Sequence, residues 1–370
     1  MTFRSEAYPT PGLCRTGGLD RVIRASRAFV AALVATFVAA GCGVAPVGTR
    51  DADRPAATLP EVQPAFGGQG QMLAGAPGGE ASWLRLQDGT QMVVVASDRP
   101  GDRHLSWASS ADGRIWTSFV PFTSGALTDV EPVLFASARG VECVFASNRW
   151  LATYALYRTS FRAGRWSEPV RLELGVGPHR APAVVRAGDR WLLAWQGPEG
   201  VSLSTSVDGV VFPQGRLLLA QHGDPAIAAV GDRVVVVAHQ RKALFSTARD
   251  AGVWSTPVRI PLPVPAWSPA LSAAASDSVA LAYATAPSDQ VAAGLGLARW
   301  SEAGWSDLGR AVSSSADLGQ PAWCAGAQAP FSLLLGMELP SLQQALVRVV
   351  WSSLPEGATA SLPTGGSAKP

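Results

Sequence analysis

Short hydrophobic runs separated by Gly, Asp and Ser recur along most of the chain, and residues 181–219 show this pattern most clearly. In that stretch the runs are residues 181–186, 191–195, 201–206 and 212–219, and the pair Gly188 and Asp189 separates the first two. The first run is apolar and β-branched and the third alternates apolar and polar residues; short runs of this kind, bounded by turn residues, predict four short strands. A single sheet of this size cannot bury both of its faces, so similar units are expected to pack beside it.

Two recurring residues, a proline and an aromatic residue, define the register of the repeat. A proline begins the first strand of successive units: Pro132, Pro182, Pro225, Pro269 and Pro321, at intervals of 50, 43, 44 and 52 residues. Proline is tolerated there because the first residue of a strand need not donate a hydrogen bond to the sheet. An aromatic residue follows the third turn of each unit, the turn between its third and fourth strands. These residues are Trp116, Trp166, Phe212, Trp254 and Trp305, at intervals of 50, 46, 42 and 51 residues. Four strands per unit with this period are typical of a β-propeller.

The number of units sets the expected architecture. Five units follow one another from Ala81, and a sixth runs from Gln320 to about Leu354 without a recognisable fourth strand. We expect a segment between Thr58 and Ala74 to supply that strand, because a closed ring has no free sheet edges. The predicted fold is therefore all-β, a six-bladed β-propeller of four-stranded blades over residues 80–354, with seven blades as the alternative.

The N-terminal residues have the order of a signal peptide. Arg21, Arg24 and Arg27 precede an apolar run over residues 28–40, and Gly41 and Cys42 follow it. The run is shorter than the roughly 20 residues that a membrane-spanning helix needs. Residues 39–42 resemble a bacterial lipobox, with Ala39 where that pattern usually has leucine. We expect a lipid on Cys42 that anchors the protein to a membrane of the cell envelope, with soluble secretion or a periplasmic location as the alternative.

The expected domain organisation follows from these segments. Residues 1–41 are predicted to be a lipoprotein-type signal peptide, and residues 42–79, rich in Ala, Pro and Gly, a flexible tether between lipid and domain. The propeller comes next, and residues 355–370 are predicted to be a disordered tail.

The charge of the chain bears on nucleic-acid binding, and its cysteines bear on disulfide formation. Of the 30 basic and 28 acidic side chains, residues 1–41 carry five and two, which leaves 25 basic and 26 acidic ones. A nearly neutral chain without basic clusters gives no electrostatic reason to expect nucleic acid. Cys143 and Cys324 fall on strands of blades that are not neighbours, so we expect two buried, unpaired thiols.

The third turns carry a second pattern. Two turns share Ser, Asp, Gly and an aromatic residue at identical spacing, and a third is a stretched version: Ser110, Asp112, Gly113, Trp116; Ser206, Asp208, Gly209, Phe212; and Asp250, Gly252, Trp254. A carboxylate in a tight turn accepts backbone hydrogen bonds, and glycine adopts positive φ there. These turns resemble the Asp-boxes of the sialidase-like (BNR repeat) propellers, in a form shortened by one residue. We expect the aspartates to hold the turns and the aromatic rings to fold between adjacent sheets.

The resemblance also implies where a ligand binds. In sialidase-like propellers the ligand lies over the axis, on the face opposite the Asp-boxes, among loops that enter first strands or join second to third strands. The candidate ligand-binding residues at those positions are Arg99, Arg149, His179, Arg180, His222, Asp224, His239, Arg241, Trp267, Tyr283 and Glu338. Such side chains can hold a sugar acid or perform acid–base chemistry. Their spacing matches no metal motif, and no cofactor is expected.

The catalytic pattern of the sialidases is missing. The family's enzymes carry an Arg-Ile-Pro motif, and the nearest equivalent here, His179-Arg180-Ala181-Pro182, has Ala in place of Ile and lies in a middle blade. The leading hypothesis is therefore a propeller that binds a glycan or an envelope protein through its loops. The alternative is a glycoside hydrolase that uses Asp129 or Glu131 together with Asp224. A structural role in the envelope is a third hypothesis.

Overall fold

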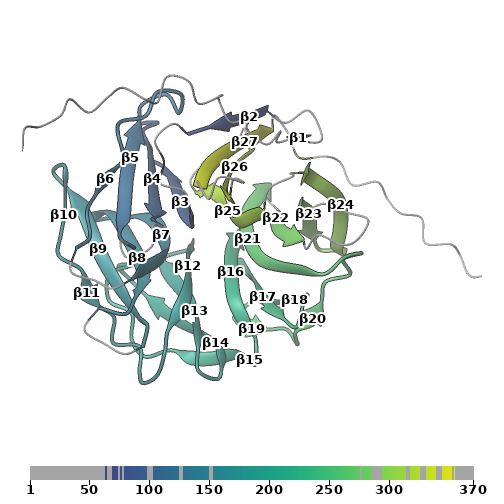
Figure 1. Ribbon diagram of the computed structural model, residues 1–370. Coiled ribbons are helices and arrows are strands. Elements are labelled where there is room, and N and C mark those ends of the chain that lie inside the picture. The colour runs from purple at the N-terminus through teal and green to yellow at the C-terminus, as the bar shows by residue number, and fades with distance from the viewer. Residues whose placement is uncertain are drawn as a thin grey trace, which may run out of the picture. The chain divides into compact units, whose positions relative to one another are not determined.

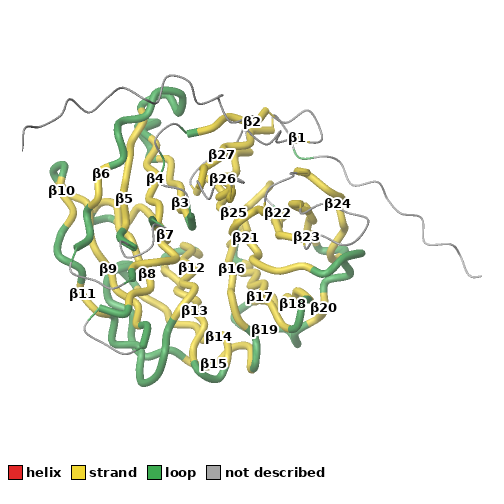
Figure 2. The backbone as a smooth tube through the Cα atoms, viewed as in Figure 1, coloured by secondary structure: helices red, strands yellow, loops and turns green. Residues whose placement is uncertain are grey.

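The computed structural model describes most of the unit Leu59–Pro370 and none of residues 1–58. The described residues are 63–64, 69–73, 76, 79–97, 103–124, 128–149, 153–275, 277–285, 294–313, 317–325, 331–338, 344–351 and 354. All their regular elements are strands (Figures 1 and 2), so this part of the chain contains no helix that could cross a membrane. The predicted signal peptide, Cys42 and the tail at 355–370 lie outside the described residues, as does Arg99.

Three antiparallel sheets come from the middle of the chain. The first contains β7 (Asp129–Ser137), β8 (Gly140–Ser147), β9 (Ala155–Arg162), β10 (Arg165–Trp166) and β11 (Val170–Arg171). The second contains β12 (Arg180–Ala187), β13 (Arg190–Gly197), β14 (Gly200–Ser206) and β15 (Arg216–Ala220). The third contains β16 (Gly223–Val230), β17 (Arg233–Gln240), β18 (Ala243–Asp250), β19 (Val253–Trp254) and β20 (Val258–Arg259).

The remaining strands join the two ends of the described chain. β21 (Ala266–Ala275), β22 (Ser278–Thr285), β23 (Gly294–Ser301) and β24 (Gly304–Ser313) form a sheet that β1 (Gln63–Pro64) extends. An eight-stranded sheet combines β3 (Ala81–Arg85), β4 (Gln91–Ala96), β5 (Leu105–Ser110) and β6 (Val120–Pro121) with β25 (Asp317–Ala325), β26 (Phe331–Glu338), β27 (Gln344–Trp351) and β2 (Gln69–Met72). A short parallel pair between β25 and β3 connects its two four-stranded halves. The sheets stand around a common centre (Figure 1), which confirms the predicted all-β propeller fold.

The last blade is completed from the N-terminal side. Residues 69–72 pair with β27 in antiparallel register, so the prediction that a segment between Thr58 and Ala74 supplies the missing strand is confirmed. The tether expected over 42–79 therefore ends too late, because β1 and β2 within it belong to sheets. The sequences of β1 (Gln-Pro) and β2 (Gln-Gly-Gln-Met) carry little strand signal, and their pairing partners lie about 250 and 280 residues further along the chain.

The second strands are buried because each lies inside a sheet that is covered on both faces. In β13, Trp191, Leu193 and Trp195 pack toward the β7–β11 blade, whereas Leu192 and Ala194 pack toward the β16–β20 blade. Alternate residues thus enter different inter-blade cores, which is why these strands are continuously apolar rather than alternating.

The aromatic residues of the third turns lie between neighbouring blades, as predicted. Each ring joins the core that its own blade shares with the preceding one: Trp166, Phe212, Trp254 and Trp305 do so in succession, and Trp116 packs edge-on against Trp83 where β3–β6 meets β25–β27. Phe212 is almost fully buried, whereas the four tryptophans are partly exposed. Cys143 and Cys324 are buried and unpaired, which confirms that prediction.

Candidate functional site

The register prolines lie at a bend in the innermost strands. In β7, β12, β16, β21 and β25 the pairing register shifts just before or at the proline, as in a β-bulge. In four of these strands the residue before the proline has positive φ: Glu131 (56°), Ala181 (47°), Asp224 (46°) and Ser268 (45°). A non-glycine residue is strained in this conformation, and the bend turns these positions out of the regular strand alternation.

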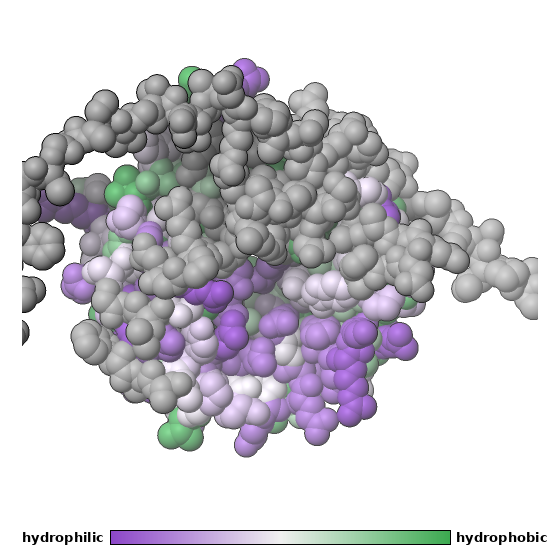
Figure 3. Space-filling model, in the orientation of Figure 1, coloured by the Kyte–Doolittle hydropathy of each residue, from purple (hydrophilic) through white to green (hydrophobic). Residues whose placement is uncertain are grey.

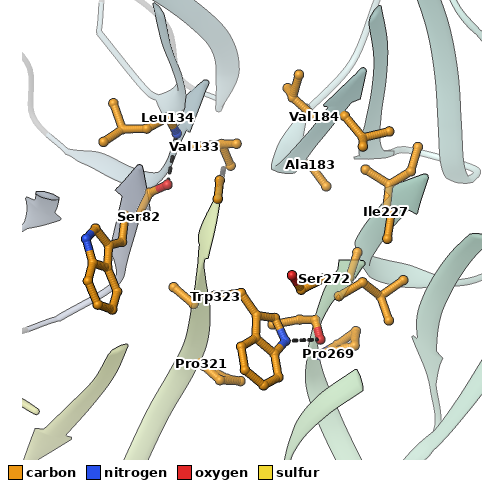
Figure 4. A pocket seen from close by; sticks show the side chains of 18 of the residues that line it. Ser82, Val133, Leu134, Ala183, Val184, Ile227, Pro269, Ser272, Pro321 and Trp323 are labelled. Atoms are coloured by element: carbon orange, nitrogen blue, oxygen red, sulfur yellow. Dashed lines mark hydrogen bonds between the residues drawn. The ribbon is translucent and has the colours of Figure 1, made fainter. Parts of the chain in front are cut away.

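The innermost strands enclose an axial pocket of about 470 Å³ (Figure 4). Its walls are mostly Pro, Ala and Val, including Pro132, Pro182 and Pro225. Two polar side chains bond to the wall itself: the Ser82 hydroxyl accepts the Leu134 N–H at 2.9 Å, and Trp323 Nε1 donates to the Ala270 carbonyl at 3.1 Å. No charged side chain is among the described residues that line this pocket, and Arg99, a predicted ligand-binding residue, lies outside the described part of the chain.

A second cavity, a groove of about 740 Å³, is lined mainly by polar and charged side chains. We call the end of the molecule that carries it the loop face: the end where second strands turn into third strands and where chains enter the innermost strands. Three such connections build the groove, those of β13–β14, β15–β16 and β17–β18. Its polar and charged lining residues are Gln196, Glu199, Gln221, His222, Asp224, His239, Gln240 and Arg241.

The groove brings together four of the predicted ligand-binding residues. His222, Asp224, His239 and Arg241 all line it, although the sequence placed them only at equivalent loop positions. Glu199 was missed, because it lies within the tight turn after Gly197 rather than next to the second strand. In Figure 3 hydrophilic residues gather over the lower part of the visible face, where β14 to β20 lie in Figure 1.

Hydrogen bonds fix the groove's side chains. The Lys242 N–H donates to His239 Nε2 at 3.1 Å, and the opposite ring nitrogen, Nδ1, lies 3.9 Å from Asp224 Oδ2. The Gln196 Oε1 accepts the Asp224 N–H at 3.4 Å. Asp224 and His239 keep 44% and 28% of their side-chain surface exposed, so both can reach a ligand.

Of the nine described non-glycine residues with positive φ, four lie in or beside this groove. Gln221, Asp224 and Arg241, which line it, and Lys242 next to it, all have positive φ without being glycine. Each such residue costs on the order of 1–3 kcal/mol, and such residues cluster at functional sites.

Two predicted carboxylates lie in the neighbouring blade and are already paired. Asp129 is fully buried and accepts a hydrogen bond from Arg149 at 2.8 Å, while the Arg149 guanidinium lies over the rings of Phe145 and Tyr157. Breaking a buried pair of this kind leaves an uncompensated charge, so its role is structural. Neither Asp129 nor Arg149 offers surface to a ligand.

Glu131 and Arg180 link two blades. One Glu131 oxygen accepts from Arg180 at 2.5 Å, and the other accepts the Ala181 N–H at 2.7 Å. The Arg180 guanidinium also lies over the Tyr154 ring, 4.6 Å from its centroid. Glu131 is 10% exposed and Arg180 43%, so of this pair only the arginine faces solvent.

His179 and Tyr283 lie inside the fold rather than at the groove. His179 is 3% exposed, its ring meets the Trp195 ring edge-on, and burial, together with Arg171, lowers its pKa. The Tyr283 hydroxyl donates to Asp307 at 3.0 Å, and burial raises its pKa. The sequence spacing equated His179 with His222, but only His222 reaches the groove. Trp267 is partly exposed in β21, and Glu338 ends β26.

The two turns that resemble Asp-boxes lie at the opposite end of the strands, and their hydrogen bonds match the predicted geometry. Asp112 Oδ1 accepts from the N–H groups of Arg114 and Ile115 at 2.7 and 2.9 Å, and the Ser110 hydroxyl donates to it at 3.1 Å. The turn of Ser206, Asp208 and Gly209 repeats the arrangement, with Val210 and Val211 as donors at 2.9 and 3.0 Å. In both turns the backbone hydrogen bonds to the carboxylate lower its pKa.

The stretched third copy behaves differently. Asp250 pairs with Arg233 at 3.3 Å, and Ala251 and Gly252 form a two-residue hairpin with positive φ between β18 and β19. The corresponding serine, Ser246, accepts a hydrogen bond from Trp305 Nε1 at 2.8 Å instead of closing its own turn. The extra residues between Ser246 and Asp250 lengthen β18, so the carboxylate no longer lies over the turn's N–H groups.

Comparisons with known proteins agree with this architecture. No protein-family model and no curated protein sequence matches the chain. Among solved structures, a protein of unknown function from Dyadobacter fermentans matches with a TM-score of 0.61 and 11% identity, over 78% of this chain and 98% of that one. A Trypanosoma rangeli sialidase bound to the inhibitor DANA matches with a TM-score of 0.54 and 10% identity, over 74% of this chain and 55% of the sialidase.

A third match is an α-L-arabinofuranosidase, Arb93A from Fusarium graminearum, with a TM-score of 0.51 and 13% identity, over 75% of this chain and 93% of that one. At these identities the similarity is one of fold. The protein has the fold of the sialidase-like propellers, and this fold also occurs in that arabinofuranosidase.

Proposed function

We propose that this protein is an exported, lipid-anchored propeller that binds a glycan in the groove on its loop face. The observation that carries the proposal is the convergence of Gln196, Asp224, His239 and Arg241 on one concave, partly exposed surface. These groups offer hydrogen-bond donors and acceptors side by side, which suits a ligand covered with hydroxyl groups. The glycoside hydrolases among the structural neighbours support the same class of ligand.

The two carboxylates that were predicted as catalytic partners of Asp224 are already engaged by other residues. A glycosidase of the usual kind needs two carboxyl groups that face the substrate. Asp129 is fully buried against Arg149, and both oxygens of Glu131 are hydrogen-bonded to Arg180 and Ala181. Of the three predicted catalytic carboxylates, Asp224 alone lines the groove, and Glu199, which the sequence did not predict, is the second carboxylate there.

A glycan array tests the proposal. We expect the protein to retain a defined set of glycans and Arg241→Ala to lose them, because the guanidinium contributes charged hydrogen bonds to the groove. Alanine fits this turn, since Ala163 and Ala251 adopt the same positive φ elsewhere in the chain. The matched control is Asp232→Asn, in the exposed β16–β17 turn at the opposite end of β17. An empty array together with capture of one envelope protein would indicate a protein ligand instead.

The hydrolase alternative is supported by the two carboxylates that line the groove, Glu199 and the exposed Asp224 beside His239. An imidazole and a carboxylate at this distance can share acid–base work. Release of 4-methylumbelliferone from a panel of neutral and sialylated glycosides, abolished in Asp224→Asn, would favour an enzyme. No release from any of them would leave the binding function.

The proposed anchor rests on the sequence around Cys42. A lipid at this residue would hold the propeller at a membrane through the segment that precedes β1. Incorporation of a fatty-acid analogue into the protein, lost in Cys42→Ser, checks the proposal; equal labelling of the two proteins would contradict it.

A further inference from the structure

The gap between Asp224 and His239 is the most specific feature of the groove. Oδ2 and Nδ1 lie 3.9 Å apart, which is too long for a direct hydrogen bond. A single oxygen atom about 2.7–2.9 Å from each of them fits between the two. The pair is therefore spaced to receive a third polar atom.

A hydrogen bond from the Lys242 N–H determines which nitrogen of the His239 ring carries the proton. His239 Nε2 accepts the Lys242 N–H, so the proton of the neutral ring is on Nδ1 and points toward Asp224. A carboxylate that accepts and an imidazole that donates match the one donor and the acceptor lone pairs of a hydroxyl group. The gap is complementary to an alcohol rather than to an ammonium or a carboxylate group.

Asp224 can hold a second hydroxyl at the same time. A carboxylate has two oxygens, and only Oδ2 faces His239 in the 3.9 Å contact. The Gln196 amide lies next to it, because its Oε1 is held by the Asp224 N–H and its Nε2 is left to donate. Two adjacent acceptors flanked by donors are the arrangement that two neighbouring hydroxyl groups require.

The position of Asp224 is fixed by the backbone. The strand bulges between Gly223 and Ala226, and Asp224 has a φ of 46° immediately before Pro225. Gly223 admits Gln196, since a Cβ there would lie 2.9 Å from the Gln196 Oε1. The strained bend and the glycine together place the carboxylate and the amide side by side.

The charges of the groove disfavour an acidic sugar. Two carboxylates, Asp224 and Glu199, line it against one guanidinium, that of Arg241. Among the lining residues a sugar carboxylate would meet two like charges and one countercharge, while Lys242 lies next to the groove. None of the described residues that line the axial pocket is charged either.

We propose that the groove binds an uncharged sugar through two neighbouring hydroxyl groups, one of which bridges Asp224 and His239. This inference rests on the proposed glycan-binding function and specifies its ligand class. Gln196 is a positioning residue for Asp224 and a donor to the second hydroxyl.

Calorimetric titration with a panel of methyl glycosides of neutral hexoses and pentoses, and with sialyllactose, tests the inference. We expect at least one neutral glycoside to bind, and sialyllactose to bind at least about tenfold more weakly. Asp224→Asn and His239→Ala should each weaken the neutral ligand about tenfold or more, since hydrogen bonds to charged groups are the strong ones. Asp232→Asn should bind like the parent, and thermal melting should show that all three variants are folded.

A deoxy analogue of the best ligand, lacking one of the two hydroxyl groups, isolates the contact. The parent should bind the deoxy analogue about tenfold more weakly than the full ligand. Asp224→Asn should bind the two ligands with nearly equal affinity, because that variant already lacks the contact. Sialyllactose binding as tightly as neutral sugars, or equal losses for the deoxy analogue in both proteins, would overturn the inference while leaving a glycan-binding function. Absence of binding by every sugar would reject both.

Discussion

Asp112 and Asp208 hold their turns as acceptors of backbone hydrogen bonds, and Asp208 also pairs with Arg139 at 3.1 Å. Asp250, in a related sequence, pairs with Arg233 instead of accepting from the N–H groups of its turn. The difference lies in the number of residues between the serine and the aspartate: one in the first two turns and three in the last. Only with the short spacing does the carboxylate accept hydrogen bonds from the N–H groups of the two residues that follow Gly113 or Gly209. The role of an aspartate in these turns is therefore decided by spacing rather than by residue type.

The lowered pKa of Asp208 predicts a pH-dependent contribution to stability. Because the folded-state pKa lies below the ordinary value of 3.8, the charged form stabilises the fold above that pH, and the contribution is lost as pH falls below it. The melting-temperature difference between the parent and Asp208→Asn should be larger at neutral pH than at pH about 3. Asp232→Asn, in another exposed turn, provides the control. A difference for Asp208→Asn that does not shrink on acidification would contradict the role of its charge.

At the scale of elements, the third-turn aromatic residues fasten each blade to the preceding one, but not equally. Phe212 is 4% exposed and packs among Trp191 and Trp195, whereas Trp116 is partly exposed against Trp83. The neighbouring Val211 is 68% exposed. Adjacent positions in one turn thus contribute very differently to the inter-blade core.

Phe212→Ala is therefore expected to cost about 3–5 kcal/mol of unfolding free energy, since it leaves a cavity between two blades. Trp116→Ala should cost less, because part of its ring is already in water. Val211→Ala should stay within about 0.5 kcal/mol of the parent. Denaturant unfolding with fitted slopes measures all three; equal costs for Phe212→Ala and Val211→Ala would contradict the proposed packing.

At the scale of the whole propeller, β2 joins the start of the described chain to its last blade. The Leu73 N–H donates to the Leu346 carbonyl at 2.9 Å, and the pairing continues through Gln71 and Arg348 to Gln69 and Val350. Without β2, β27 would present a free edge, which invites pairing with other chains. Closure is thus a contact between distant parts of the sequence.

A proline placed in β2 tests the closure. Alternation along an antiparallel pair directs the N–H of Gln71, like that of Leu73, toward β27 and that of Gly70 away from it. Gln71→Pro should lower stability by about 1 kcal/mol or more and promote association of copies, whereas Gly70→Pro should cost less. Thermal melting and light scattering check this. Equal behaviour of the two variants would show that β2 does not close the ring.

Much of the fold was readable in the sequence because it depends on local pattern. The apolar second strands, the prolines at 132, 182, 225, 269 and 321 and the recurring aromatic residues specify the strands and their period, and the structure confirms the propeller. The turns at Asp112 and Asp208 could also be predicted from the sequence, because each of the hydrogen bonds that Ser and Asp make within these turns links residues three positions apart or fewer.

The candidate site was only partly readable, and the tertiary structure decided the rest. Sequence placed His179, His222, Tyr283 and Asp129 on similar loops, but neighbouring blades buried three of them and left His222 at a groove. The start of the propeller at β1 and β2 was likewise fixed by strands far away in the chain. Local periodicity in the sequence therefore determined the strands and turns. The burial and direction of each side chain, and the pairing of distant strands, depended on contacts between blades, and a single stretch of sequence does not contain those contacts.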